Sequence, residues 1–109
     1  MVAVRGELDL STAPELEGPL ESALEGGNAP VLIDLIECEF IDSTGIAMIV
    51  RAWQQLEGDE ERAGRLMIAN RNDQVQRVLE ISGLNLTIPI HPSRDAGLAA
   101  LGGSSAEQV

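Results

Sequence analysis

The chain has 109 residues, which suits one domain, and its 44% hydrophobic and 23% charged residues are typical of a globular protein, which excludes a disordered or membrane-embedded class. Its formal net charge of −11 at pH 7 would repel a phosphate backbone, so we expect no direct nucleic acid partner. The sequence has no long apolar run and no signal-type N-terminus, so we expect no membrane span and a cytoplasmic location.

The first predicted elements are a strand and a helix. Alternating apolar residues predict the strand, and they are Val2, Val4, Leu8 and Leu10. The helix follows because Thr12 and Glu15 match a capping box, with Pro14 in the first turn. Its buried stripe is expected to contain Leu16, Leu20, Ala23 and Leu24, and residues 26–28 are expected to end it.

The next predicted pair is a buried strand and a longer helix. The nearly continuous apolar run at 30–37 predicts a strand covered on both faces, at the centre of a sheet. Cys38 is the only cysteine, so we expect no internal disulfide and assign it to the core. The helix after residue 42 is expected to face inward through Ile46, Ile49, Val50, Trp53 and Leu56, and to end in an exposed loop at 58–64.

The last third of the chain repeats this alternation. A short strand is predicted at 65–70, and Asp73 opens a helix that ends at Ser82 and a left-handed Gly83. That helix is expected to bury Val75, Val78, Leu79 and Ile81. A marginal strand at 86–91 is placed at a sheet edge, because Pro89 lacks a backbone donor. Ser93 is expected to cap a final helix that runs through Leu101.

This alternation of strands and helices predicts an α/β fold. We expect a single domain over residues 1–101, with a mostly parallel or mixed sheet of about four strands and alternating helices. Residues 102–109 are expected to form a flexible C-terminal tail.

The residues Asp42, Ser43, Thr44 and Gly45 stand out at the predicted start of a helix, after the end of the central strand. One capping residue stabilises a helix start, so three polar residues and a glycine exceed what capping requires. We expect Gly45 to leave room for an approaching molecule. A phosphoryl group on Ser43 would be tolerated at a helix N-terminus, and its charge beside Asp42 would drive off a docked partner.

Catalysis and metal binding have weaker support in the sequence. A serine hydrolase would need a base next to Ser43, but the only histidine, His91, is predicted at the end of the last strand, and the Gly-x-Ser-x-Gly elbow is absent. Glu37, Glu39 and Asp42 have no nearby histidine to complete a metal site. We therefore expect no enzyme activity, no cofactor and no metal.

Four stretches of the sequence resemble the anti-sigma factor antagonists, which are built on the STAS domain. They are "GELDLSTAPEL" at 6–16, "FIDSTGIAMIV" at 40–50, "VQRVLEISGL" at 75–84 and "DAGLAAL" at 95–101, in the order that the family has them. The resemblance implies a STAS-like domain over residues 1–101.

The resemblance also implies a partner-switching role. The unmodified protein would bind an anti-sigma factor that is also a serine kinase, which frees a sigma factor for transcription. Phosphorylation of Ser43 would reverse this, and a separate phosphatase would restore the binding form; ATP would belong to the kinase. The implied partner-binding residues are Asp9, Thr12, Asp42, Ser43, Thr44 and Gly45.

Two alternatives accompany this interpretation. The family usually has another strand before the Gly-Glu-Leu-Asp strand, but only Met1 to Arg5 precede Gly6 here. We therefore expect either a chain that begins late or an open sheet edge that would favour a homodimer. The second alternative is a STAS domain that is never phosphorylated, as a scaffold or a nucleotide-sensing or lipid-sensing subunit of a larger assembly.

Overall fold

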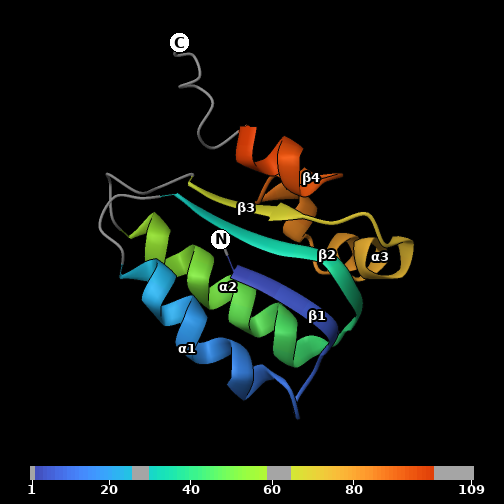
Figure 1. Ribbon diagram of the computed structural model, residues 1–109, viewed down its shortest axis with the longest axis horizontal. Helices are drawn as coiled ribbons and strands as arrows, with labels where there is room; N and C mark the ends of the chain where they lie inside the picture. Colours follow the sequence, from blue (N-terminus) through green and yellow to red (C-terminus); the bar gives the residue numbers. More distant parts are fainter. Residues whose placement is uncertain (1, 26–29, 59–64, 100–109) are drawn as a thin grey trace.

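The computed structural model describes residues 2–25, 30–58 and 65–99 (Figure 1). One sheet has the order β1-β2-β3-β4 with every neighbouring pair parallel, and its strands are β1 (Val2–Leu8), β2 (Val31–Ile41), β3 (Leu66–Ala69) and β4 (Ile90–His91). The helices are α1 (Ala13–Leu24), α2 (Ser43–Glu57), α3 (Asp73–Ile81), the 3-10 helix η1 (Leu84–Leu86) and a helical segment at 94–99. The predicted α/β fold of four strands with alternating helices is confirmed, and the sheet is parallel rather than mixed.

Several predictions fall outside the described residues. The closing turn at 26–28, most of the loop at 58–64, the end of the last helix at Leu101 and the tail at 102–109 all stay predictions. In the described ranges, no helix is long and apolar enough to cross a membrane.

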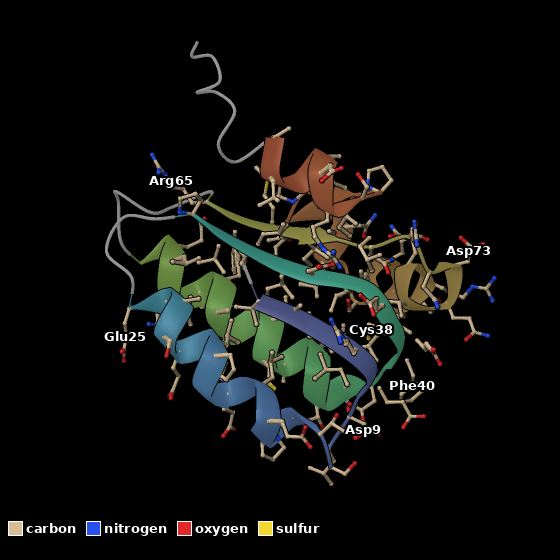
Figure 2. All side chains as sticks on the ribbon, viewed as in Figure 1. Asp9, Glu25, Cys38, Phe40, Arg65 and Asp73 are labelled. Atoms are coloured by element: carbon tan, nitrogen blue, oxygen red, sulfur yellow. The ribbon has the colours of Figure 1, made fainter. Side chains whose placement is uncertain are left out.

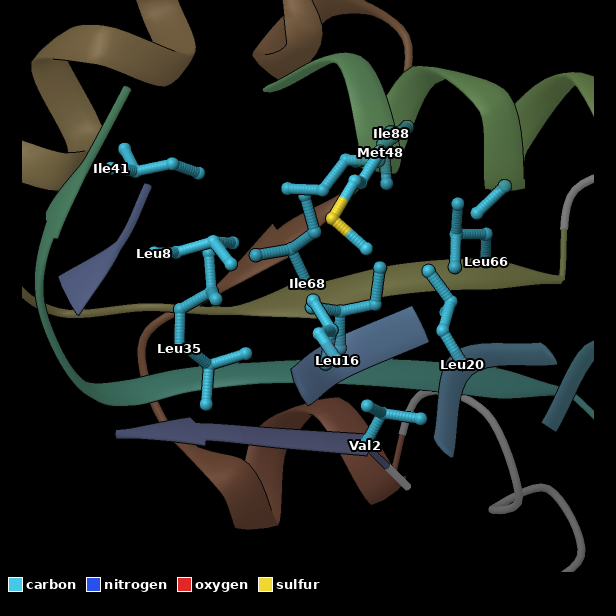
Figure 3. Packing of buried hydrophobic residues seen from close by; sticks show 14 of the residues in the cluster. Val2, Leu8, Leu16, Leu20, Leu35, Ile41, Met48, Leu66, Ile68 and Ile88 are labelled. Atoms are coloured by element: carbon cyan, nitrogen blue, oxygen red, sulfur yellow. The ribbon is translucent and has the colours of Figure 1, made fainter. Parts of the chain in front are cut away.

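Helices cover both faces of the sheet. Figure 1 shows α1 and α2 side by side along the sheet, and Figure 3 shows Leu16 and Leu20 of α1 and Met48 of α2 meeting strand residues such as Leu35 and Ile68. The segment at 94–99 covers the other face, where Gly97 packs so tightly on Leu32 that an added Cβ would lie 2.9 Å from the leucine Cδ1. β2 is therefore buried on both sides, as the apolar run at 30–37 predicts.

Two β-bulges interrupt the pairing of β2 with β1. The buried residues of β2 that belong to the core cluster are spaced by two up to Leu35 and then by three, at Cys38 and Ile41. Each bulge adds one residue to β2, so the next core residue comes one position later. The paired residues on either side of the bulges are Ala3 with Asp34, Arg5 with Glu37, Gly6 with Cys38, and Glu7 with Phe40.

Two predicted core residues are wrong. Leu10 is 76% exposed, because β1 ends at Leu8 and the chain turns at Asp9 before α1 begins. Ile81 is 80% exposed because it lies two residues, or about 200°, from the buried Leu79 around the helix axis. Ala23 is only partly buried.

The buried face of α2 is rotated around the helix axis relative to the predicted one. Met48 and Ala52 are buried there, while Ile46, Val50 and Trp53 are only partly buried. Ile49 and Leu56 are buried as predicted.

Among the helix ends in the described ranges, one sequence signal is wrong. Thr12 does not form the predicted capping box of α1: its hydroxyl donates to the Glu7 carbonyl at 2.7 Å and accepts from the N–H of Asp9 at 2.9 Å, so it makes no side-chain cap. Ser93 accepts from the N–H of Ala96 at 3.0 Å, and Gly83 has φ +82°, so these two predictions are confirmed.

A buried carboxylate holds the last helix to the sheet. Asp34 in β2 is 1% exposed, and the guanidinium of Arg94 donates to its Oδ2 while the N–H of Ile36 donates to Oδ1 at 3.0 Å. Arg94 also lies 3.5 Å from Glu37. A carboxylate this deep requires its cation, because an unpaired buried charge is strongly unfavourable.

We predict that Arg94→Met lowers the free energy of unfolding by about 2 to 3 kcal/mol, because the Asp34 carboxylate remains buried without its cation. The double variant Asp34→Asn/Arg94→Met should recover part of that loss, since the asparagine oxygen still accepts from Ile36. Urea unfolding of both variants measures the difference. Equal stability of Arg94→Met and the unsubstituted protein would contradict the prediction.

Candidate functional site

The start of α2 lies at the carboxyl end of β2 and is capped by Asp42. The Asp42 Oδ1 accepts hydrogen bonds from the N–H groups of Thr44 at 2.8 Å and Gly45 at 3.3 Å. The N–H of Asp42 donates to the carbonyl of Leu8 at 3.1 Å, which fixes this helix start to the end of β1. Asp42 is therefore the residue whose side chain caps α2.

Ser43 is the first residue of α2 and is exposed. Its hydroxyl makes no hydrogen bond to any other residue in the described ranges. Thr44, the next residue, is partly buried. Ser43 is therefore an accessible hydroxyl on a rigid helix start, where a modifying enzyme could reach it.

Gly45 serves the core, which corrects the expectation that it leaves room for an approaching molecule. It is buried, and an added Cβ would lie 2.8 Å from the Ile41 Cγ1 and 2.8 Å from the Leu8 Cγ. Those distances are too short for real contacts, so only glycine lets α2 approach the ends of β1 and β2 this closely. Gly45 therefore lets the helix start that carries Ser43 pack against the strand ends.

The turn after β1 is ordered by Asp9. Its Oδ1 accepts from the Ser11 hydroxyl at 2.7 Å and from the N–H groups of Ser11 and Thr12 at 3.0 and 3.1 Å. The N–H of Asp9 donates to the Thr12 hydroxyl at 2.9 Å, so Thr12 closes the turn from the other side. These bonds hold the loop in one conformation without a partner.

Asp9 is a carboxylate at neutral pH. The hydrogen bond from the Ser11 side chain lowers the pKa of Asp9 below its usual value. Desolvation raises the pKa, and the bonds from the Thr12 and Ser11 N–H groups and from the Thr12 hydroxyl lower it further. Ser11 was not among the predicted site residues. The Asp-x-Ser pattern at 9–11 was the available signal, because it is typical of this kind of turn.

The Asp9 turn and the start of α2 form one surface. Leu8 and Ile41 are paired residues at the ends of β1 and β2, so Asp9 and Asp42 follow at neighbouring strand ends. Figure 2 shows Asp9 and Phe40 at this same end of the molecule. The structure thus brings together the predicted residues Asp9, Thr12, Asp42, Ser43, Thr44 and Gly45, with Gly45 beneath the surface.

His91 does not join this surface. It lies in β4, and β3 separates β4 from β2 in the sheet. Its Nε2 is buried and has no hydrogen-bond partner in the described part of the chain. A serine–histidine pair with Ser43 is therefore not formed. No group of three His, Cys, Asp or Glu side chains that could hold a metal ion occurs in the described ranges.

This chain is similar in sequence to one domain family and to proteins named as regulators. The sequence model of the STAS domain matches residues 1–97. The anti-sigma-B factor antagonist of Listeria monocytogenes is 34% identical over 89 residues, which cover 82% of this chain and 75% of that protein. The anti-sigma-B factor antagonist of Staphylococcus aureus is 34% identical over 83 residues, which cover 76% and 74%.

A solved structure has the same fold. The crystal structure of an anti-sigma factor antagonist from Mycobacterium paratuberculosis superposes with a TM-score of 0.80 and 29% sequence identity. The match covers 91% of this chain and 81% of that one.

We predict that Gly45→Ala destabilises the protein by about 1 to 3 kcal/mol, because the new methyl group overlaps Leu8 and Ile41. Gly58→Ala at the end of α2 is the matched control: φ is −75° there, and an added Cβ would lie 3.6 Å and 3.7 Å from the carbonyl oxygens of Gln54 and Gln55, which is ordinary van der Waals contact. Its effect should stay within about 0.5 kcal/mol. Thermal unfolding of both variants checks the difference. An unchanged midpoint for Gly45→Ala would contradict the packing role.

Proposed function

Because this chain belongs to the STAS domain family, and within it to the anti-sigma factor antagonists, we propose that it binds an anti-sigma factor through the surface around Ser43 and thereby releases a sigma factor. The observation that carries the proposal is the exposed, unbonded hydroxyl of Ser43 on a rigid helix start. In the proposed complex, Asp9, Thr12, Asp42 and Thr44 contact the partner. Gly45 contributes by letting α2 pack close to the strand ends.

The proposed switch is phosphorylation of Ser43 by the partner, which is then both an anti-sigma factor and a serine kinase. A phosphoryl group adds a charge of about −1.5 to −2 at pH 7. It would lie next to the capping carboxylate of Asp42, and the Asp9 turn follows at the neighbouring strand end. Where a partner packs against the Ser43 hydroxyl, the bulk of the phosphoryl group and the cost of removing water from its charge would both weaken the complex. A phosphatase would return the protein to its binding form.

Two features of the surface support this role. The Asp9 turn is held by its own hydrogen bonds, so little conformational entropy is lost when a partner binds. The start of α2 is tied to β1 through Asp42 and Leu8, so the Ser43 hydroxyl is presented at a fixed position for phosphoryl transfer. The cofactor of that reaction, ATP, belongs to the kinase.

We predict that Ser43→Ala abolishes phosphorylation and keeps partner binding, while Ser43→Asp weakens binding about tenfold or more, because the added carboxylate has to lose its water where the partner packs. The full chain is incubated with ATP and a lysate of its own organism, and the phosphorylated residue is located by mass spectrometry. Proteins of the lysate that bind the chain are captured with it and identified by mass spectrometry. Their affinities for the purified variants are measured by calorimetry.

Ser22→Ala is the control, because Ser22 is an exposed serine in α1, outside the Asp9 turn and the start of α2. It should leave phosphorylation of Ser43 intact. Equal affinity of Ser43→Ala and Ser43→Asp for the partner would refute the charge switch. No phosphate on Ser43, in a lysate with active serine kinases, would favour the unphosphorylated scaffold or sensing subunit instead.

We also propose that two copies pair through the outer edge of β1. In the described ranges no strand lies on that side of β1. If two β1 strands pair antiparallel about Gly6, each exposed Arg5 lies opposite an exposed Glu7 of the other copy. Such opposite-charge pairs stabilise neighbouring strands. The net charge of −11 on each copy opposes association, so added salt should favour the dimer.

We predict that sedimentation equilibrium detects this dimer and that Glu7→Lys weakens it, because the substituted side chain then places a second positive charge opposite Arg5. The charge-reversed double variant Arg5→Glu/Glu7→Lys restores the opposite-charge pairs and should restore the dimer. A monomer at all salt concentrations would overturn the proposed pairing without affecting the role of Ser43.

A further inference from the structure

Two large apolar side chains are exposed at the end of the molecule that carries Ser43. Leu10 is 76% exposed and Phe40 is 48% exposed. Phe40 is the only phenylalanine in the chain. Three other large apolar residues are exposed in the described ranges, and all lie elsewhere in the chain: Ile81, Leu86 and Leu98.

The exposure of Phe40 is built into the fold. The second bulge of β2 lies between Cys38 and Phe40, and it places Cys38 and Ile41 in the core. The intervening residues Glu39 and Phe40 are consequently left exposed. The carbonyl of Phe40 accepts a 3.2 Å bond from the buried Cys38 thiol, which holds its backbone in place. A bulge next to a functional residue commonly redirects a side chain in this way.

The exposure of Leu10 is equally fixed. Leu10 lies between Asp9 and Ser11, whose side chains are joined by the 2.7 Å hydrogen bond within the turn. The turn backbone is held on both sides of Leu10, so its side chain cannot fold back into the core without breaking these bonds.

The two apolar residues lie on adjoining strand ends. Phe40 pairs with Glu7 in the sheet, and Leu10 follows Leu8, whose carbonyl bonds to Asp42. Figure 2 shows Phe40 and Asp9 at the same end of the molecule. The surrounding side chains are acidic, and those of Glu7, Glu39, Asp9 and Asp42 are exposed or partly buried. This end of the molecule thus carries two exposed apolar residues, Leu10 and Phe40, together with these four acidic residues, which we call the acidic rim.

We propose that Leu10 and Phe40 are the apolar anchors that dock this protein onto its anti-sigma factor, in an apolar pocket bordered by lysine or arginine. The inference rests on the proposed function, and it assigns separate roles to the apolar anchors, the acidic rim and Ser43. The anchors supply most of the binding energy, as large buried side chains do at interface centres, and the acidic rim selects a basic border. Phosphorylation of Ser43 regulates the binding, because it changes the charge beside the anchors without moving them.

The first test locates the contact. A photo-crosslinking phenylalanine analogue is placed at position 10, 40, 81 or 86, one position at a time, in the full chain. Each unphosphorylated variant is irradiated in a lysate of its own organism, and the adducts are identified by mass spectrometry. Positions 81 and 86 are matched controls, because Ile81 and Leu86 are also large, apolar and exposed.

Adducts with an anti-sigma factor at positions 10 and 40, and none at 81 and 86, are expected. Adducts with an anti-sigma factor only at 81 and 86 would overturn the anchor assignment and leave the proposed function standing. No adduct with an anti-sigma factor at any of the four positions would overturn both.

The second test measures how much each anchor contributes to the binding affinity. It uses the purified form of the anti-sigma factor that the first test identifies. Leu10→Ala and Phe40→Ala should each weaken binding about tenfold to thirtyfold, while Leu86→Ala should change it less than about twofold. Leu10→Ala and Leu86→Ala should keep the thermal midpoint of the unsubstituted protein, because these residues are 76% and 87% exposed. Phe40→Ala should lower it slightly, because Phe40 is about half buried, at 48% exposed. Unchanged affinity for both anchor variants, with binding by the unsubstituted protein intact, would refute the anchor role alone.

Discussion

The structure depends on one constraint in β2, which is packed on both faces from Val31 to Leu35 and whose far end, at Ile41, meets the end of the shorter β1. From the pair Val2 and Ile33 onward, a regular β2 would run two residues past β1. The two bulges absorb these two residues and bring Ile41 opposite Leu8. Every later feature of the site follows from that alignment: the bond from Asp42 to Leu8, the start of α2 and the outward direction of Phe40.

The alignment also explains why the glycine at position 45 lies where it does. Helix α2 starts one residue after Asp42, so its first turn passes directly over Leu8 and Ile41. No side chain fits in that space. The same glycine that the sequence suggests as an opening for a partner is instead a close contact between helix and sheet, and the proposed partner surface lies at the exposed side of the helix start, where Ser43 is.

Sequence patterns predicted the number and order of the strands and α-helices, because βα units have strong periodic signals. They missed the 3-10 helix η1, and the strand predicted at 86–91 is confirmed only at Ile90–His91. The candidate site residues lie at neighbouring strand ends, and their role stays a prediction. Bulges have no such signal, so the switch from a spacing of two to a spacing of three in β2 was missed. Leu10 was misplaced because an apolar residue just beyond a strand's end still matches the strand's period, although the backbone has already turned. Ile81 was misplaced because it is apolar and follows Val78 by three residues, while Val78 is itself only partly buried. The partner of Asp34 was also missed, since sixty residues separate it from Arg94.

The way Asp42 caps α2 bears on how long the proposed phosphorylated form lasts. Because its carboxylate already occupies the N–H groups of Thr44 and Gly45, a phosphoryl group on Ser43 would find these donors taken. It would keep most of its water shell and stay mobile, instead of being locked into the protein by backbone bonds. A modification that the fold does not stabilise is also one that a hydrolase can remove with no unfolding step, so its lifetime would be set by enzyme concentrations in the cell.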